Sequence, residues 1–340
     1  MKKALVLIGV IAWVAVLLIV ITVMSGMFRG GYNMHNNMVL LKEADTSIVG
    51  ITGIIVDADS QDIEFYSSGE PNLKIRQYSS KNTLEEELFV VSRENSVIRI
   101  SARHMLRVFS INFGFSDKLL IEIPQNWLGD IDVGLFSGNI RLSDAFMWNN
   151  VNLSSSSGDL LLRNELTAKN LNLNASSGNI QARDGHIIAN KISATTSSGD
   201  IRLQAPLTAQ SISIKATSGN ISLDQASVEQ FAFRNSSGDI KVKSLSGGGS
   251  ATVTSGNINI SLSDLVGDVD LQASSGNVRL SLSPELSCNF TGRCTSGDIH
   301  ANFPLTKNEK GNRATATIGE TPVLTINAET TSGNIRVDRL

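Results

Sequence analysis

From residue 127 to the C-terminus, apolar and polar residues alternate on both sides of a glycine that returns at regular intervals. Around Gly219, for example, the residues seven and five positions before the glycine are Ile212 and Ile214, and those two and four positions after it are Ile221 and Leu223. Apolar residues at every second position indicate a β-strand with one buried face. Each repeat therefore predicts two strands joined by a glycine turn.

The glycine lies in the motif Ser-Gly-Asn/Asp followed by Ile, Leu or Val, which occurs ten times at spacings of 20, 20, 21, 20, 19, 18, 20, 21 and 36 residues. A fixed period near 20 residues is typical of a solenoid. We predict an all-β parallel β-solenoid of about ten coils, with two strands per coil, over residues 125–340. The long last interval predicts a hairpin insertion near residues 307–319, before the final coil. The motif glycines are Gly138, Gly158, Gly178, Gly199, Gly219, Gly238, Gly256, Gly276, Gly297 and Gly333.

Residues 46–124 also alternate apolar and polar positions between Gly, Pro, Asn and Ser residues, as in "NLKIRQYS" and "KLLIEIP". They show no copy of the glycine motif. This pattern predicts a β-rich N-terminal cap on the solenoid.

The first 24 residues differ from the rest of the chain. Residues 4–24 form an uncharged apolar run without proline, long enough to cross a membrane as a helix. A cleaved signal peptide is the alternative, but its apolar stretch is shorter and ends in a small-residue cleavage site. We expect an uncleaved transmembrane anchor, with residues 25–45 as a linker. Lys2 and Lys3 place residues 1–3 in the cytoplasm and the bulk of the chain on the extracytoplasmic side of the cell membrane.

The net charge of −3 excludes a chain built to attract nucleic acid. The two cysteines are too few for a cysteine-based metal site. Cys294 takes a position where other coils have alanine, so we expect it to pack as a small buried residue. A disulfide between Cys288 and Cys294 remains an alternative for an exported chain.

The repeated motif itself favours a structural turn over a reactive site. Glycine tolerates a positive φ, and Asn or Asp can bond the turn backbone. Asp occupies only four of the ten Asx positions and never two consecutive copies. A calcium site usually needs several carboxylate ligands close together, which this pattern does not supply. The four histidines lie outside any serine-hydrolase motif and outside zinc-ligand spacing. We therefore predict no catalytic residue, no metal site, no cofactor and no enzymatic activity.

The combination of an N-terminal anchor, a strand-rich segment ending in "KLLIEIP", coils of the type "VDLQASSGNVRL" and a closing "INAETTSGNIRV" resembles a bacterial family. This is the β-strand-repeat family of toast-rack proteins, also called "putative adhesin" proteins. The resemblance covers residues 48–340. It implies an extracytoplasmic envelope protein, in some members associated with envelope stress, and supplies no catalytic residues.

Basic residues gather at the outward positions three and five residues after the glycines. Two interpretations follow: a solvated face balanced by nearby aspartates, or, as a hypothesis, a surface that contacts an anionic envelope polymer or lipid headgroups. The candidate binding residues are Arg141, Arg163, Arg183, Arg202, Lys241 and Arg279.

These observations predict a membrane-anchored, non-enzymatic interaction or scaffold protein of the bacterial envelope. One alternative is a self-assembling or regulatory element that signals to a membrane partner. It depends on an uncapped last coil that ends at Leu340, through which copies of the chain would associate. A polysaccharide-acting enzyme is a further alternative, although the outward faces offer no pair of carboxylates.

Overall fold

The computed structural model describes residues 38–80, 88–102 and 117–340. The expected cytoplasmic tip, the transmembrane segment and most of the linker lie outside these residues. Within the described ranges, no helix is long and apolar enough to cross a membrane. Strand β1 (Val39–Ser47) begins inside the segment that was expected to be a linker, so the boundary lies at residue 38 instead of 45.

The described residues contain strands and no helix, as the alternating pattern predicted. Ten longer strands each end on the serine of the motif, and a second strand begins two residues after the motif glycine. The strands that end at the motif are β8 (Asp130–Ser137), β11 (Asn150–Ser157), β13 (Leu166–Ser177), β15 (Ile187–Ser198), β17 (Leu207–Ser218), β19 (Ala226–Ser237), β20 (Ile240–Ser255), β22 (Val269–Ser275), β24 (Cys288–Ser296) and β28 (Thr325–Ser332). The strands that follow it are β9 (Ile140–Leu142), β12 (Leu160–Leu162), β14 (Ile180–Ala182), β16 (Ile201–Leu203), β18 (Ile221–Leu223), the first part of β20, β21 (Ile258–Asp264), β23 (Val278–Leu282), β25 (Ile299–Ala301) and β29 (Ile335–Arg339).

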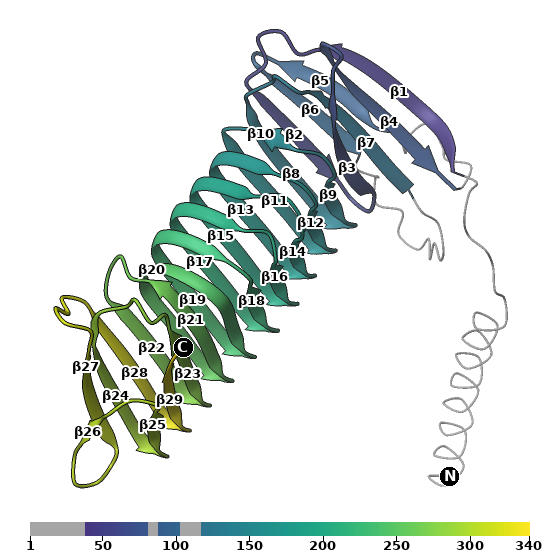
Figure 1. Cartoon of the computed structure of the whole chain (residues 1–340). Helices are drawn as coiled ribbons and strands as arrows, with labels where there is room; N and C mark the ends of the chain where they lie inside the picture. Colours follow the sequence, from purple (N-terminus) through teal and green to yellow (C-terminus); the bar gives the residue numbers. More distant parts are fainter. Residues whose placement is uncertain (1–37, 81–87, 103–116) are drawn as a thin grey trace, which may run out of the picture. The chain divides into compact units, whose positions relative to one another are not determined.

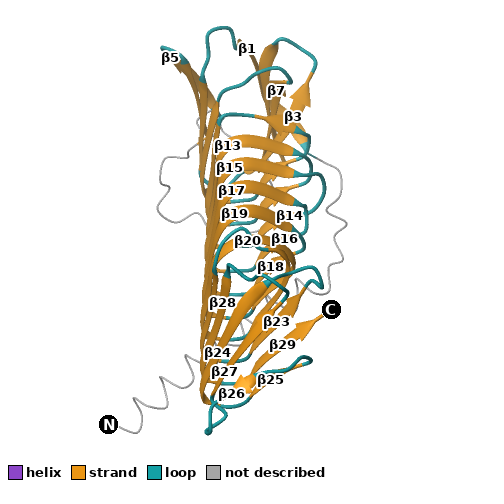
Figure 2. Ribbon diagram, turned by 60° about the vertical axis from the view of Figure 1, so that its left-hand side comes forward, coloured by secondary structure: helices purple, strands orange, loops and turns teal. Residues whose placement is uncertain are grey.

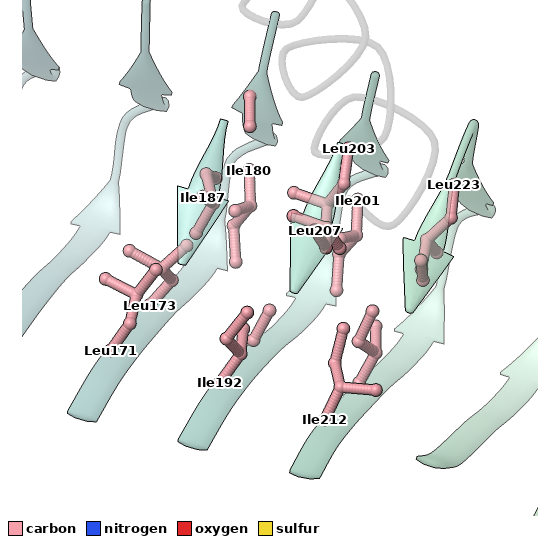
Figure 3. Close-up of a cluster of buried hydrophobic side chains, with 14 of the residues drawn as sticks. Leu171, Leu173, Ile180, Ile187, Ile192, Ile201, Leu203, Leu207, Ile212 and Leu223 are labelled. Carbon is pink, nitrogen blue, oxygen red and sulfur yellow. The ribbon is translucent and has the colours of Figure 1, made fainter. Parts of the chain in front are cut away.

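Equivalent residues of successive coils lie side by side in parallel register. Leu171 of β13 pairs with Ile192 of β15, which pairs with Ile212 of β17. Figures 1 and 2 show the longer and the shorter strands stacking as two rows. Their apolar side chains meet between the rows and are buried almost completely (Figure 3). The coils share one aliphatic core, so that each coil depends on its neighbours for burial.

Strands β13, β15, β17 and β19 have a bend that the sequence analysis did not predict. Two consecutive residues, such as Lys169 and Asn170, both face outward, and the pairing register skips the first of them. One extra outward residue exchanges the faces of a strand, and the strand bends there. Each of these coils thus gains a third side, formed in β13 by residues 166–168.

The last coil in the sequence is not the last coil of the stack. Strand β28 pairs with β22 on one side and with β24 on the other, and β29 lies in the same way between β23 and β25. In Figure 1 the C-terminus lies beside β23, while β24 to β27 form the end of the stack. The expectation of a terminal coil that ends at Leu340 is therefore wrong.

The predicted insertion forms a hairpin of β26 (Thr306–Lys307) and β27 (Arg313–Ile318). Strand β27 pairs antiparallel with the outer edge of β24 along six residue pairs. An antiparallel strand ends the parallel stack and satisfies the backbone groups of β24. The longer-strand row is thus capped, and the uncapped end expected from the sequence is wrong for this row.

The N-terminal region belongs to the same stack. Strands β2 (Gly53–Ala58) and β3 (Asp62–Ser68) pair in parallel with β8 and β9 on one side and with β6 (Val97–Ala102) and β7 (Asp117–Pro124) on the other. Strands β5 (Val90–Glu94), β4 (Asn72–Ser79) and β1 add antiparallel pairs outside them. Because one 29-stranded sheet holds all the described strands, the expected boundary at residue 124 does not separate two folds. The short β10 (Phe146–Met147) extends the row next to β13.

Candidate functional site

The motif glycines form a column in which successive backbones touch. An added Cβ on any of the nine glycines from Gly158 to Gly333 would lie 1.9–2.2 Å from the carbonyl oxygen of the glycine in the neighbouring coil. Eight of the ten glycines also have a positive φ, for example +133° at Gly219. The turn therefore needs glycine mainly because the coils approach so closely there. The column follows the spatial order, since Gly333 contacts Gly276 and Gly297 contacts Gly333.

The residues after the glycines form a continuous hydrogen-bond ladder. The backbone N–H of Asp159 donates to Oδ1 of Asn139 at 2.9 Å, and the N–H of Asn179 donates to Oδ1 of Asp159 at 2.7 Å. The same bond recurs through every later coil, up to the N–H of Asp298 and Oδ1 of Asn334 at 2.9 Å. Each Asn or Asp thus satisfies a backbone donor of the next coil, as expected for a structural turn.

The ladder contains one member that the sequence analysis missed. The N–H of Asn139 donates to Oδ1 of Asp62 at 2.9 Å, so the segment Ser60-Gln61-Asp62-Ile63 takes the place of a motif with Gln instead of Gly. In the order of the stack, Asp never follows Asp, and the Nδ2 groups of Asn139, Asn179 and Asn257 donate to the Asp before them. An Asn next to an Asp adds a bond where a second Asp would add repulsion.

The predicted basic residues occupy one side of the stack but do not form an unbroken stripe. Arg141, Arg202, Lys241 and Arg279 belong to one outward column of the shorter strands, where Leu161, Gln181, Ser222 and Asn259 separate them. Arg163 and Arg183 follow the ends of β12 and β14 and are exposed. The six candidate binding residues thus lie on the side of the stack formed by the shorter strands. Neutral residues of the intervening coils separate most of them.

Acidic or amide groups accompany several of these cations. Arg141 pairs with Asp62 at 3.3 Å, Arg202 pairs with Asp200, and Arg279 lies 3.7 Å from Asp338. Arg183 donates to Oε1 of Gln181 at 2.9 Å. Local partners lower the field that a distant anion would experience.

The two cysteines belong to the buried core of the stack. Cys288 and Cys294 are buried free thiols, and burial raises the pKa of both. They lie six residues apart on strand β24, about 20 Å in an extended strand, whereas a disulfide joins Cα atoms about 4.4–6.8 Å apart. The disulfide left open by the sequence is not formed. In the part of the chain that the structure describes, no three His, Cys, Asp or Glu side chains could hold a metal ion.

The family model Toastrack DUF4097 matches this chain twice, over residues 51–204 and 185–338. Together the two matches span residues 51–338. The chain belongs to the Toastrack family. No curated protein shows a sequence match to it.

Solved structures similar to this Toastrack chain include proteins of two bacterial genera. A "putative lipid binding protein" from Parabacteroides distasonis is 14% identical, with a TM-score of 0.46 and coverage of 88% of this chain and 97% of the other. A "putative adhesin" from Bacteroides fragilis is 13% identical, with a TM-score of 0.39 and coverage of 90% and 98%. A "putative adhesin" from Parabacteroides merdae is 12% identical, with a TM-score of 0.38 and coverage of 90% and 97%.

The Toastrack stack also contains a buried carboxylate that the sequence analysis did not single out. Glu64 accepts hydrogen bonds from Lys118 and from Ser143 Oγ, the latter at 2.6 Å. Burial alone would raise the pKa of Glu64, but the hydrogen bonds from Lys118, Ser143 and Tyr66 and the charge of Lys118 lower it from 4.5 to about 2. So low a pKa makes Glu64 a poor general base, and the cluster ties β3 to β7 and to the end of β9.

A second feature missed from the sequence is a hollow of about 660 Å³ along the bend of the longer strands. We call it the corner groove. It lies between the outward columns Met147, Thr167, Ile188, Thr208 and Asn149, Lys169, Asn190, Gln210, over a floor of Ala168, Ala189 and Ala209. The sequence did hold a signal. Apolar residues recur twelve and ten positions before five of the motif glycines, whereas the next apolar pair lies at the odd positions seven and five before the glycine.

Proposed function

We propose that this Toastrack protein is a non-enzymatic interaction scaffold, held to the bacterial cell membrane by residues 4–24, with the solenoid on the extracytoplasmic side. The observation that carries the proposal is the repetition of the surface. The residue three positions after the motif glycine faces outward in all ten coils and is Arg or Lys in five of them. A surface that repeats at each coil, about 4.8 Å, suits an extended ligand with a repeating chemistry better than a single small substrate.

The ligand class that we propose is an anionic polymer of the envelope, in contact with the basic side of the stack. Arg163, Arg183 and Lys241 are exposed there. Their attraction to a polyanion would be screened by salt, and the aspartates beside Arg141 and Arg202 would limit it. A role in the envelope-stress response would require that stress changes this binding and that a membrane partner detects the change.

The test uses intact spheroplasts that display the full chain, with a fluorescent polyanion added outside. Binding should fall roughly five- to tenfold when Arg141, Arg163, Arg183 and Arg202 are all replaced by Ser, and it should weaken with salt. The matched control replaces Lys215 and Arg234, which face outward from the longer strands, and should bind normally. Absence of binding by the wild-type chain, or unchanged binding by the fourfold variant, would contradict the proposal.

A further inference from the structure

The corner groove has the composition of a binding site for an apolar molecule. Met147 and Ile188 line one side and are 55% and 37% exposed, although large apolar side chains are usually buried. Ala168, Ala189 and Ala209 lie in the floor at 6–8% exposure, as inward-facing members of the core between the two outward columns. Half of the lining residues are apolar and the others are polar or charged, and an apolar hollow with polar groups at its rim is typical of a ligand site.

The groove runs across the strands. Toward the N-terminal end of the stack, Trp148 precedes the alanines in the floor, and its buried ring stacks on Phe146 with a centroid distance of 4.3 Å. Glu229 of β19 lies at the other end. The floor between them spans three coils, or about 10–15 Å at the spacing of paired strands. A narrow, linear occupant fits this length and width.

The backbone beneath the groove offers no free strand edge. Strand β13 pairs with β11 and β15, β15 with β13 and β17, and β17 with β15 and β19. An added peptide strand needs an edge with unpaired backbone groups, which these strands lack. A hydrocarbon chain needs no such partners and is stabilised by the apolar surface that it covers.

The charges at the rim select a head group. Lys169 is the basic residue among those that line the groove, and it lies between Asn149 and Asn190 of the adjacent coils. Glu229, at the far end, would repel an anion there. An amphiphile fits these charges if its anionic head group lies beside Lys169. Its uncharged chain would then cover Ala189 and Ala209 and point toward Glu229.

We propose that the corner groove binds a single unbranched acyl chain, that of a medium-chain fatty acid, with its carboxylate at Lys169. This site lies on the bend of the longer strands, whereas the basic residues proposed to bind an anionic polymer lie on the side of the shorter strands. It therefore does not depend on the anionic-polymer proposal.

The test is photo-crosslinking of the full chain in its membrane with decanoic acid that carries a diazirine. Tryptic peptides 184–191 and 203–215 should carry most of the label, because they contain Ile188 and Ala209. Replacing Ile188 by Asp places a charge in the groove and should lower this label at least fivefold. Lys169→Glu should also lower it, whereas Lys169→Arg and Ile188→Val should keep it.

The matched control is Leu161→Asp, the same type of change at an outward position of the shorter strands. It should leave the label unchanged. The fourfold arginine variant, which lacks the cleavage sites at 183 and 202, should carry the same label in the peptides 170–191 and 192–215. Thr208→Asp repeats the test at an exposed position if the Ile188 variant does not fold. The proposal is overturned if the label spreads evenly over the coils or persists in the folded Asp variants. A groove that instead joined two copies would also overturn it, and would appear as a dimer that Ile188→Asp dissociates.

Discussion

At the scale of single residues, the turn glycines have a role that composition alone does not show. Gly219 meets the carbonyl oxygen of Gly199, and a side chain at this position has nowhere to go. Backbone atoms of the adjacent coil are held by their own ladder bonds, so they cannot move aside easily. Space and a positive φ act together at this position.

We predict that Gly219→Ala lowers the free energy of unfolding by about 3 kcal/mol, from the overlap with backbone and the strain at φ +133°. Gly69→Ala is the matched control, because a Cβ there has no neighbour within 4 Å and no positive φ is involved. Denaturant unfolding of both variants measures the difference. Equal stability of the two would contradict a close approach of the coils.

The Glu64 cluster predicts a specific dependence on pH. Because the pKa of Glu64 falls from 4.5 to about 2 on folding, its contribution is complete above pH 4.5 and is lost as the pH falls toward 2. This difference in pKa corresponds to about 3 kcal/mol. Glu64→Gln should lower stability at pH 7 and should make stability depend less on pH between 4.5 and 2. Parallel pH profiles of the wild type and this variant would show that the cluster does not act in this way.

At the scale of elements, much of the fold could be predicted because the alternation is strict. The strands from Ile212 and Ile214 to the turn, and from Ile221 to Leu223, follow directly from a period of two and a glycine turn. The segment Ser60-Gln61-Asp62-Ile63 was missed because Gln hides the motif. The bend at Lys169 was not predicted because the expected strand extended only to seven residues before the glycine. The apolar positions beyond the bend lie further back, at twelve and ten residues before the glycine.

The position of the last coil could not be predicted from the repeat. Strand β28 carries the same alternation as β22 and β24, so local pattern gives it no preference for either neighbour. The hairpin β26–β27 decides the order, because it covers the outer edge of β24 and leaves the inner edge for β28. Long-range pairing of this kind depends on tertiary context and not on the residues of one coil.

The candidate sites, too, could be predicted from the sequence only in part. The basic residues could be located from their spacing after each glycine, but their partners Asp62 and Asp338 come from segments whose position follows from the order of the stack. The corner groove depends on the bend and on the stacking of alanines from three coils. Such a surface exists only after the coils have assembled.

At the scale of the whole described unit, both ends of the stack are built alike. At each end one coil is inserted out of chain order, and an antiparallel strand, β5 or β27, covers the outermost parallel strand of the longer row. Covered edges oppose growth by addition of further copies at this row. The outward basic residues of the shorter strands and the corner groove both require one continuous stack between these ends.

The most direct test of this account is disulfide trapping between exposed motif serines, in a chain whose two native cysteines are replaced by alanine. Ser275 and Ser296 each pair with Ser332 of β28. Neighbouring strands place Cα atoms about 4.8 Å apart, within the reach of a disulfide, whereas strands separated by one coil lie about 9.6 Å apart. We predict that the cysteine pairs at 275 and 332 and at 296 and 332 form intramolecular disulfides and that the pair at 275 and 296 does not. A disulfide between 275 and 296 that forms as readily as the other two would contradict the order of the stack.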